Sequence, residues 1–219
     1  MKKAIKAILL LLLLFLIALP IVCNTEHQEL SAEVRTQTSG DYIQLSLGTV
    51  HYQQANIGAG KTVVLVHGFS VPYYIWDPTY DFLVAQGYHV LRYDLYGRGY
   101  SDRPDVDYTQ ALFDQQLVEL LAALKINQPI DIIGLSMGGA VVAKFVADHP
   151  EKVRKIVFID PSHEAFYSWA LSTPLLGEYI ATVHMLPKAA NSQLGDFSNP
   201  EKYASWPDKY RQQMQYHGF

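Results

Sequence analysis

Short apolar runs alternate with segments of helical apolar spacing between about residue 42 and residue 159. Because strands are apolar in short runs and amphipathic helices repeat every three to four residues, both elements can be placed from this pattern. The run TVVLV at 62–66 is typical of a strand buried on both faces. We expect strands over 42–47, 50–53, 62–66, 88–93, 130–133 and 153–159, and helices over 76–85, 108–124 and 137–148. This alternation predicts an α/β fold, with a mostly parallel sheet covered by helices on both faces.

The carboxyl-terminal quarter of the chain has a different pattern. Residues 165–219 contain no apolar strand run, but they carry large apolar side chains among Pro and Ser. Those side chains are Trp169, Leu175, Leu176, Tyr179, Ile180, Tyr203 and Trp206. We interpret 165–219 as the start of a helical lid, and the polar, aperiodic segment 24–40 as a linker.

The amino terminus has the pattern of a targeting segment. Three lysines within residues 1–6 precede an unbroken apolar run over 7–22. This run is shorter than the roughly 18 to 20 residues that span a bilayer, and Pro20 interrupts it near its end. We therefore expect 1–23 to be a signal peptide, or a signal anchor if it is not cleaved. Either one predicts an exported protein, periplasmic or extracellular, or one anchored to the membrane by this segment.

Composition and charge exclude several classes of protein. Apolar residues make up 49% of the chain and charged residues 17%, which suits a globular core. The net charge is −4, and no basic run follows the first few residues, so we expect no nucleic-acid partner. The single cysteine, Cys23, allows neither an intramolecular disulfide nor a cysteine-based zinc site, and we expect no metal.

The segment Gly134–Gly139, GLSMGG, contains a G-x-S-x-G pattern between an expected strand and an expected helix. A serine on such a sharp turn needs a strained backbone, and side chains two positions away on either side would collide with the turn. Gly134 and Gly138 meet that demand, which makes Ser136 the candidate nucleophile. Met137 would open the helix, so its N–H has no partner within the helix and is a candidate oxyanion donor.

A second oxyanion donor is expected from an earlier loop. His67, Gly68 and Phe69 directly follow the strand expected over 62–66. The glycine would let this loop turn back toward Ser136, and the N–H of Phe69 is the natural second donor. We assign His67 a supporting role in this loop.

Three segments together resemble the α/β-hydrolase superfamily: VLVHGF at 64–69, YDLYGRGYS at 93–101 and GLSMGG at 134–139. The resemblance covers about residues 42–165. It implies an α/β-sheet enzyme that attacks a carbonyl through serine, with a histidine base, an acid that orients it and no cofactor. A serine at position 136 argues against the dehalogenase and epoxide-hydrolase branches, which use aspartate there. Within this resemblance Asp94, Arg98 and Ser101 hold neighbouring loops, so Gly97 and Gly99 do not mark a phosphate loop.

The base and the acid are not identifiable in the same way. In the superfamily the chain order is serine, acid, histidine, and His163, His184 and His217 follow Ser136 without the usual Gly-x-x-His setting. Asp160, at the end of the last expected strand, is a possible acid. We expect a chain that stops inside its lid and lacks the carboxyl-terminal strands of the fold. The strand over 153–159 would then be an uncovered apolar edge, and the product would be unstable and prone to aggregate.

These features predict an N-terminal targeting segment at 1–23, a linker at 24–40, the N-terminal part of a hydrolase core at 41–164 and an incomplete lid at 165–219. The favoured function is hydrolysis of carboxylic esters with an apolar acyl group, through an acyl-enzyme intermediate. Carbon–carbon bond hydrolysis, cofactor-free haloperoxidase chemistry and a non-catalytic, ligand-binding remnant stay open. The expected partner is a small apolar ester, and membrane contact is expected only through 7–22, if these are not cleaved.

Overall fold

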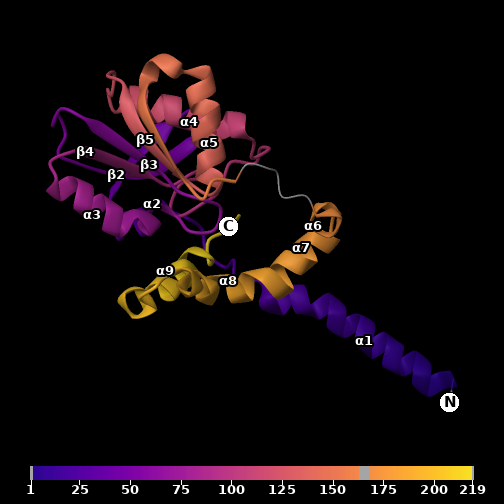
Figure 1. The fold of residues 1–219 in the computed structure, drawn as a ribbon. Coiled ribbons are helices and arrows are strands. Elements are labelled where there is room, and N and C mark those ends of the chain that lie inside the picture. The colour runs from indigo at the N-terminus through magenta and orange to yellow at the C-terminus, as the bar shows by residue number, and fades with distance from the viewer. Residues whose placement is uncertain (1, 163–167, 219) are drawn as a thin grey trace. The chain divides into compact units, whose positions relative to one another are not determined.

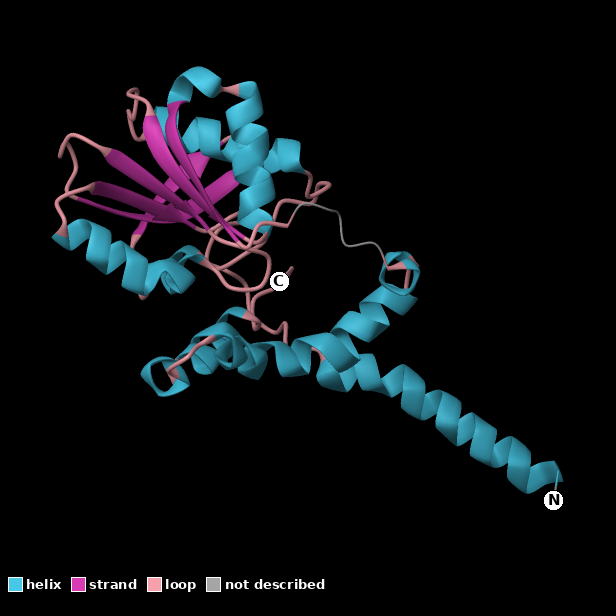
Figure 2. Ribbon diagram, in the orientation of Figure 1, coloured by secondary structure: helices cyan, strands magenta, loops and turns pink. Residues whose placement is uncertain are grey.

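The computed structural model describes residues 2–162 and 168–218. The chain divides into two compact units (Figures 1 and 2). The sheet unit comprises Glu29–Ala165 and Gly218–Phe219, and the helical unit comprises Met1–Gln28 and Phe166–His217.

A six-stranded sheet forms the centre of the sheet unit, in the order β1-β2-β4-β3-β5-β6. β1 and β2 pair antiparallel with each other, and β2 pairs antiparallel with β4, whereas the other neighbours are parallel. In the parallel part, Val64 lies beside Leu91 on one side and Ile132 on the other. The strands are β1 (Asp41–Leu45), β2 (Gly48–Ala55), β3 (Thr62–Val66), β4 (His89–Tyr93), β5 (Ile130–Leu135) and β6 (Val153–Ile159). The predicted fold class, an α/β fold with a mostly parallel sheet, is confirmed.

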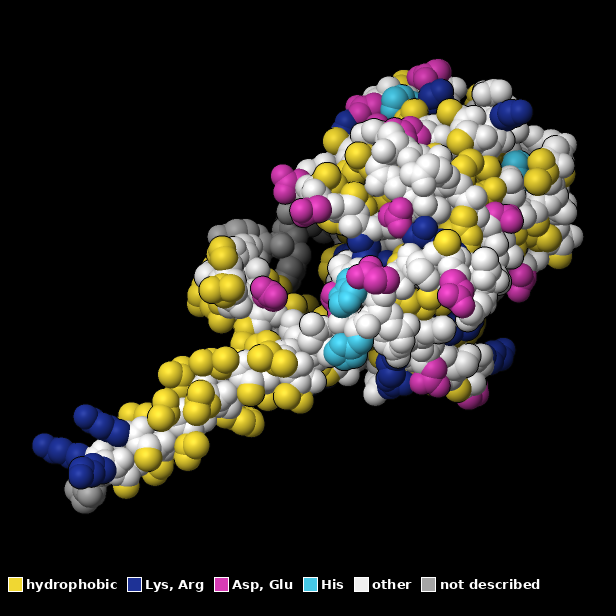
Figure 3. Space-filling model, turned by 180° about the vertical axis from the view of Figure 1, so that it is seen from behind, with side chains coloured by type: hydrophobic (Ala, Val, Ile, Leu, Met, Phe, Trp, Pro, Cys, Tyr) yellow, Lys and Arg dark blue, Asp and Glu magenta, His cyan; other side chains and the backbone are white. Residues whose placement is uncertain are grey.

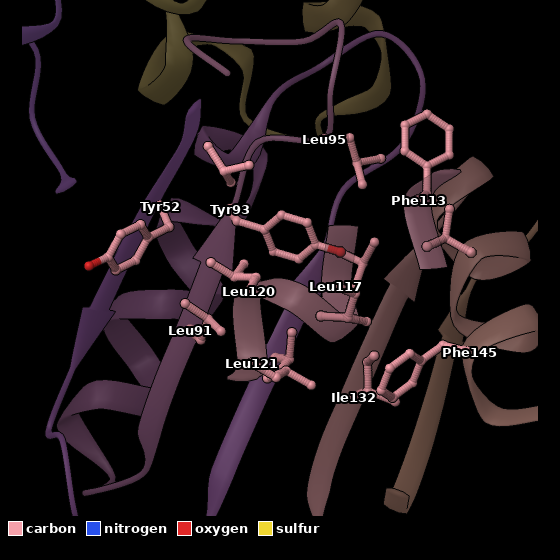
Figure 4. Packing of buried hydrophobic residues seen from close by; sticks show 14 of the residues in the cluster. Tyr52, Leu91, Tyr93, Leu95, Phe113, Leu117, Leu120, Leu121, Ile132 and Phe145 are labelled. Carbon is pink, nitrogen blue, oxygen red and sulfur yellow. The ribbon is translucent and has the colours of Figure 1, made fainter. Parts of the chain in front are cut away.

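Helices pack on this sheet through two separate apolar clusters. The larger cluster joins the sheet to α4 (Gln110–Ala123) and α5 (Met137–Asp148), and Figure 4 shows Leu117 and Phe145 within it. The smaller cluster joins strand residues to Trp76 and Tyr80, at the start of α3 (Asp77–Ala85). Short 3-10 turns, η1 (Tyr73–Trp76) and η2 (Pro150–Lys152), precede α3 and β6. Both faces of the sheet thus carry a buried core, as the alternation of strands and helices predicts.

β6 differs from the strands at the centre of the sheet. It occupies one end of the strand order and pairs with β5 alone. The four apolar side chains Ile156, Val157, Phe158 and Ile159 are all exposed, whereas every residue of β3 and β4 is buried. The expected uncovered apolar edge is therefore present in this structure.

The segment 24–40, expected to be aperiodic, contains a short helix, α2 (Ala32–Thr36). The hydroxyl of Ser31 accepts a hydrogen bond from the N–H of Val34 and caps it, and Arg35 forms an ion pair with Asp102. A helix of five residues is too short to show in the spacing of apolar residues, which is why the sequence pattern missed it. Residues 24–28 belong to the helical unit and 29–40 to the sheet unit.

The helical unit begins with α1 (Lys2–Cys23), which is longer than the apolar run 7–22. Its 22 residues include an 18-residue window with a mean hydropathy of 3.0, which is long and apolar enough to cross a membrane, and signal sequences share these properties. The other helices are α6 (Trp169–Ser172), α7 (Leu176–Ile180), η3 (Ala181–Met185, a π-helix), α8 (Leu186–Ser192), η4 (Gln193–Asp196), η5 (Pro200–Tyr203) and α9 (Trp206–Gln213). The rings of Phe197, Tyr203 and Trp206 pack against one another with centroids 4.4 to 5.1 Å apart.

Candidate active site

Ser136 is the single residue between the end of β5 and the start of α5. Its φ of 51° and ψ of −121° lie in a region that L-residues rarely adopt. Three backbone hydrogen bonds hold it there: its N–H donates to the carbonyl of Ile159 (3.0 Å), and its own carbonyl accepts from the N–H groups of Gly139 (2.9 Å) and Ser162 (3.0 Å). A strained backbone that the surrounding structure enforces in this way is typical of functional sites.

Close backbone packing explains the glycines around Ser136. A Cβ atom on Gly134 would lie 2.6 Å from the carbonyl oxygen of Gly138. A Cβ on Gly138 would overlap the carbonyl oxygen of Val66 and lie 2.5 Å from that of His67. The pattern G-x-S-x-G therefore reflects two contacts at which no side chain fits.

The loop that follows β3 lies directly beside Ser136. A Cβ on Gly68 would be 3.1 Å from Ser136 Cβ and 3.5 Å from its Oγ. The structure thus brings together the two sequence segments that were expected to share a site, although they are far apart in the chain.

The two expected oxyanion donors, Met137 and Phe69, adjoin Ser136 and Gly68 in the chain, and their role stays a prediction. Met137 is the first residue of α5, so its N–H has no partner within the helix and lies at the positive end of the helix dipole. Phe69 directly follows Gly68, and its carbonyl accepts a hydrogen bond from Arg98 Nε (2.6 Å). The guanidinium of Arg98 also lies over the Phe69 ring, 4.4 Å from its centroid, so that Arg98 holds both the backbone and the side chain of Phe69.

His67 is fully buried, and both of its ring nitrogens are engaged. Nε2 accepts a hydrogen bond from the N–H of Leu95 (2.9 Å), so the ring proton is on Nδ1, which donates to the carbonyl of Gly68 (2.7 Å). Burial lowers the pKa of His67 to about 4. A neutral imidazole with these two bonds can support the loop but has no free nitrogen for a proton from Ser136.

Asp94, the residue after β4, is the centre of a buried polar network. Its carboxylate accepts hydrogen bonds from His51 Nδ1 (2.7 Å), Tyr73 N–H (2.8 Å) and Tyr100 N–H (3.0 Å). Burial alone would raise the pKa of Asp94, but the hydrogen bond and the charge of His51 hold it below its usual value. A Cβ on Gly99 would overlap this carboxylate, so the glycine makes room for Asp94.

The pairing of His51 with Asp94 is a contact that sequence reasoning missed. His51 Nε2 also lies 2.7 Å from the carbonyl of Ser39, and the ring stacks between Tyr42 and Tyr73. The only signal in the sequence was a histidine within an expected strand, which does not identify the partner.

The structure brings no histidine of the sheet unit that it describes to Ser136 as a base. His51 and His67 are engaged as above, His89 bonds Thr62 and Gln54, and His149 bonds Asp114. His163 lies outside the described residues. His184 and His217 belong to the helical unit.

Asp160 directly follows β6, and its φ of 42° is in the left-handed region. The residue before it, Ile159, accepts the hydrogen bond from the Ser136 N–H, so Asp160 lies at the same edge of the sheet as the serine. Its role as the acid stays a prediction. Within residues 2–162 and 168–218, no group of three or more His, Cys, Asp or Glu side chains is arranged to hold a metal ion.

Residues 61–208 match the family described as the alpha/beta hydrolase fold, and the chain belongs to this family. Among curated relatives, it is 29% identical over 173 residues to Lipase 1 of Psychrobacter immobilis, covering 77% of this chain and 50% of the lipase. It is 38% identical over 105 residues to the 2-hydroxymuconate semialdehyde hydrolase of Pseudomonas putida, covering 47% and 37%. The chain spans about a third to a half of the length of the curated relatives it matches.

Solved structures show the same fold. A carboxylesterase study of Nitrososphaera gargenis provides a structure with a TM-score of 0.65 and 23% identity, which covers 81% of this chain and 68% of that chain. The enol-lactonase of Burkholderia xenovorans has a TM-score of 0.64 and 21% identity, with 80% and 67% covered.

Proposed function

We propose that Ser136 is the nucleophile of a hydrolase that acts on carboxylic esters with an apolar acyl group. The observation that carries this proposal is the strained backbone of Ser136 at the junction of β5 and α5, with Gly68 against its side chain. In the proposed reaction, Oγ attacks the ester carbonyl carbon while its proton passes to a base. The carbonyl oxygen becomes an oxyanion held by the N–H groups of Met137 and Phe69. The alcohol then leaves with a proton, and water hydrolyses the acyl-enzyme.

The exposed side chain of Phe69 is evidence for a substrate with an apolar acyl group. Phe69 is 59% exposed and directly follows Gly68, which lies against Ser136, so the loop beside the nucleophile carries exposed apolar surface. The match with a lipase over 77% of the chain is consistent with an ester substrate.

The general base is the part of this mechanism that the described histidines of the sheet unit do not supply. Its four described histidines, His51, His67, His89 and His149, each have another partner. A serine hydroxyl without a base is a weak nucleophile. Measuring the reactivity of Ser136 therefore decides whether a base acts on it.

Labelling with a fluorophosphonate probe tests the proposal. The full chain is expected to form one covalent adduct, located at Ser136 by mass spectrometry of its peptides, and Ser136→Ala is expected to abolish it. Ser46→Ala, at an exposed serine distant in sequence, is the matched control and should label like the unaltered chain. Absence of labelling in folded protein would instead favour a non-catalytic, ligand-binding role.

A second candidate function, hydrolysis of a carbon–carbon bond, uses the same serine against a ketone carbonyl. The 38% identity to a 2-hydroxymuconate semialdehyde hydrolase favours it. A panel of nitrophenyl esters with increasing acyl length, run beside a vinylogous diketone, separates the two reactions. We expect turnover of the esters, rising with acyl length, and preference for the diketone would overturn the ester assignment.

We also propose that residues 1–23 direct the chain out of the cytoplasm, as a signal or as an anchor. The support is the lysine-rich start followed by the apolar helix α1. N-terminal sequencing of protein recovered from the exported and membrane fractions tests both the export and the cleavage.

A further inference from the structure

In the helical unit after α1, exposed large apolar side chains are concentrated in one stretch. Among the described residues of 168–217, the large apolar side chains that are exposed are Trp169, Leu175, Leu176 and Met185. We call these four residues the apolar face. Trp169 is 69% exposed and Leu175 is 81% exposed, so they contribute little to the packing of the unit.

The second half of the unit behaves differently. The residues after Met185 bury their large side chains, including Trp206, Tyr210, Met214 and Tyr216. The sequence from 186 to 217 has seven charged residues of both signs, whereas Glu178 is the one Asp, Glu, Lys or Arg in the sequence from 168 to 185. Apart from α1, the exposed large apolar side chains of the unit therefore belong to the segment 169–185.

Local backbone contacts join the elements that carry these four side chains. A Cβ on Gly177 would overlap the carbonyl oxygen of Leu171, so α6 and α7 touch through their backbones. The N–H of Gly177 donates to the carbonyl of Thr173 (2.8 Å), and α7 continues into η3 without a break.

The apolar face belongs to the same compact unit as α1, and η3 packs against α1. Residues 2–18 of α1 are exposed, while Leu19, Pro20 and Cys23 near its carboxyl end are half-buried. Figure 1 shows this end beside the stretch from α7 to α8, and Figure 3 shows hydrophobic side chains along α1 with lysines at its amino end. The hydrogen bonds from the N–H groups of His27 and Gln28 to the carbonyl of Gln215 (both 2.8 Å) tie the segment after α1 to the same unit.

We propose that the apolar face binds the surface of the lipid bilayer into which α1 inserts. At 1.5 Å per residue α1 is about 33 Å long, close to the roughly 30 Å thickness of the hydrocarbon layer. Its three lysines retain the amino end on the cytoplasmic side, so the carboxyl end emerges at the outer surface, where η3 packs. An exposed Trp beside exposed Leu and Met side chains suits the interface between headgroups and acyl chains. Residues 168–185 contain Glu178 and no Lys or Arg, so nothing there attracts anionic lipid, and net-neutral, zwitterionic phosphatidylcholine is the lipid used in the test.

The sequence alone indicates membrane contact only through residues 7–22. The proposed contact adds the apolar face to it. It does not depend on catalysis by Ser136, so a failure of either proposal leaves the other to be tested.

The tryptophans of this chain provide a direct readout. Trp76 and Trp206 are buried and Trp169 is exposed, so the difference in fluorescence between the full chain and Trp169→Phe reports Trp169. The full chain is reconstituted into phosphatidylcholine vesicles with or without bromine on the acyl chains. We expect the Trp169 emission to be blue-shifted, strongly quenched by the brominated lipid and protected from aqueous acrylamide.

Two variants test whether the face itself makes the contact. Leu175→Asp is compared with the double variant Leu175→Asp/Trp169→Phe, so that the difference again reports Trp169. It is expected to lose most of the quenching by brominated lipid. Flotation with the vesicles through α1 and the circular dichroism spectrum should stay unchanged. Ile57→Asp is the matched control, because Ile57 is 73% exposed in a turn of the sheet unit, and it is expected to quench like the unaltered chain.

Two results would overturn the proposal. If the Trp169 emission stays red-shifted and is quenched by aqueous acrylamide, the apolar face lies in water. A blue-shifted emission without quenching by brominated lipid would show that protein covers the face, either another segment of the chain or a second copy.

Discussion

The core around Ser136 in the sheet unit and the segment 169–185 in the helical unit contrast in how far their apolar side chains are exposed. In the sheet unit, Tyr93, Phe145, Leu65 and Leu91 are buried almost without residual exposure, and the turn around Ser136 leaves no room for a single added Cβ. In the helical unit the described elements after α1 are helical segments of four to eight residues, and one stretch of them leaves Trp169 and Leu175 in the open.

This contrast has a physical consequence for function. A nucleophile in a strained backbone needs surroundings that enforce the strain, and close packing of β3, β5 and α5 provides them. A surface that binds lipid needs the opposite, since apolar side chains that are already buried cannot be transferred into a bilayer. The two regions are therefore suited to different tasks, and the following changes test how far they differ.

The largest effect is expected for Gly138→Ala. The added Cβ would overlap the carbonyl oxygen of Val66 and approach that of His67, and neither backbone group can move without disturbing β3. We expect the free energy of unfolding of the sheet unit to fall by about 4 kcal/mol. Urea unfolding followed by circular dichroism measures it.

Gly195→Ala is the matched control in the helical unit. A Cβ there meets no atom within 4 Å, so we expect a change within about 1 kcal/mol. A similar loss for both variants would show that the contacts of Gly138 with Val66 and His67 are not what makes the substitution costly.

Trp206→Ala is expected to destabilise the helical unit alone. Trp206 is buried against Phe197 and Tyr203, and loss of the indole should cost about 3 kcal/mol. Hydrogen exchange should speed up in α8 and α9 while β3, β4 and β5 keep their protection. The same substitution at the exposed Trp169 should change stability by about 0.5 kcal/mol or less. Faster exchange of the central strands in Trp206→Ala would mean that the units unfold together.

Acid should weaken the sheet unit through His67. Its pKa is about 4 in the folded chain against 6.5 ordinarily, so the unfolded chain takes up the proton first as the pH falls. The contribution to stability is complete above pH 6.5 and is lost between 6.5 and 4, a decrease of about 3 kcal/mol in the free energy of unfolding. Urea midpoints across this pH range measure it. His67→Gln removes the titrating ring and should flatten this part of the profile, and an unchanged slope would exclude His67 as its source.

The smallest effect in free energy is expected for Gly68→Ala. The new methyl would lie 3.1 Å from Ser136 Cβ and crowd the nucleophile without entering a core. We expect fluorophosphonate labelling to slow by about tenfold, with thermal stability nearly unchanged. Gly195→Ala should label at the rate of the unaltered chain, and a Gly68→Ala variant that does likewise would show that this loop does not shape the site.

Much of the sheet unit was predictable because its elements are long enough to show their periodicity. The strand 62–66 and the helix 137–148 have the same bounds in the structure as in the sequence pattern. α2 escaped prediction since its five residues are stabilised by the Ser31 cap and the contact of Arg35 with Asp102, a residue distant in the chain.

The candidate site shows the same division. G-x-S-x-G identifies Ser136 because local sterics alone demand glycine at 134 and 138. The bond between His51 and Asp94 joins β2 to the residue after β4, and no local pattern encodes which acid a buried histidine will meet.

The sequence by itself thus determined the α/β class, the position of Ser136 and the apolar character of α1, because periodicity, turn sterics and hydropathy act over short stretches of chain. Only the tertiary structure decided that Gly68 lies against Ser136, that both nitrogens of His67 are occupied, and that the exposed side chains of α6, α7 and η3 belong to one unit with α1. These facts depend on contacts between residues far apart in the chain, which form only when the whole unit packs.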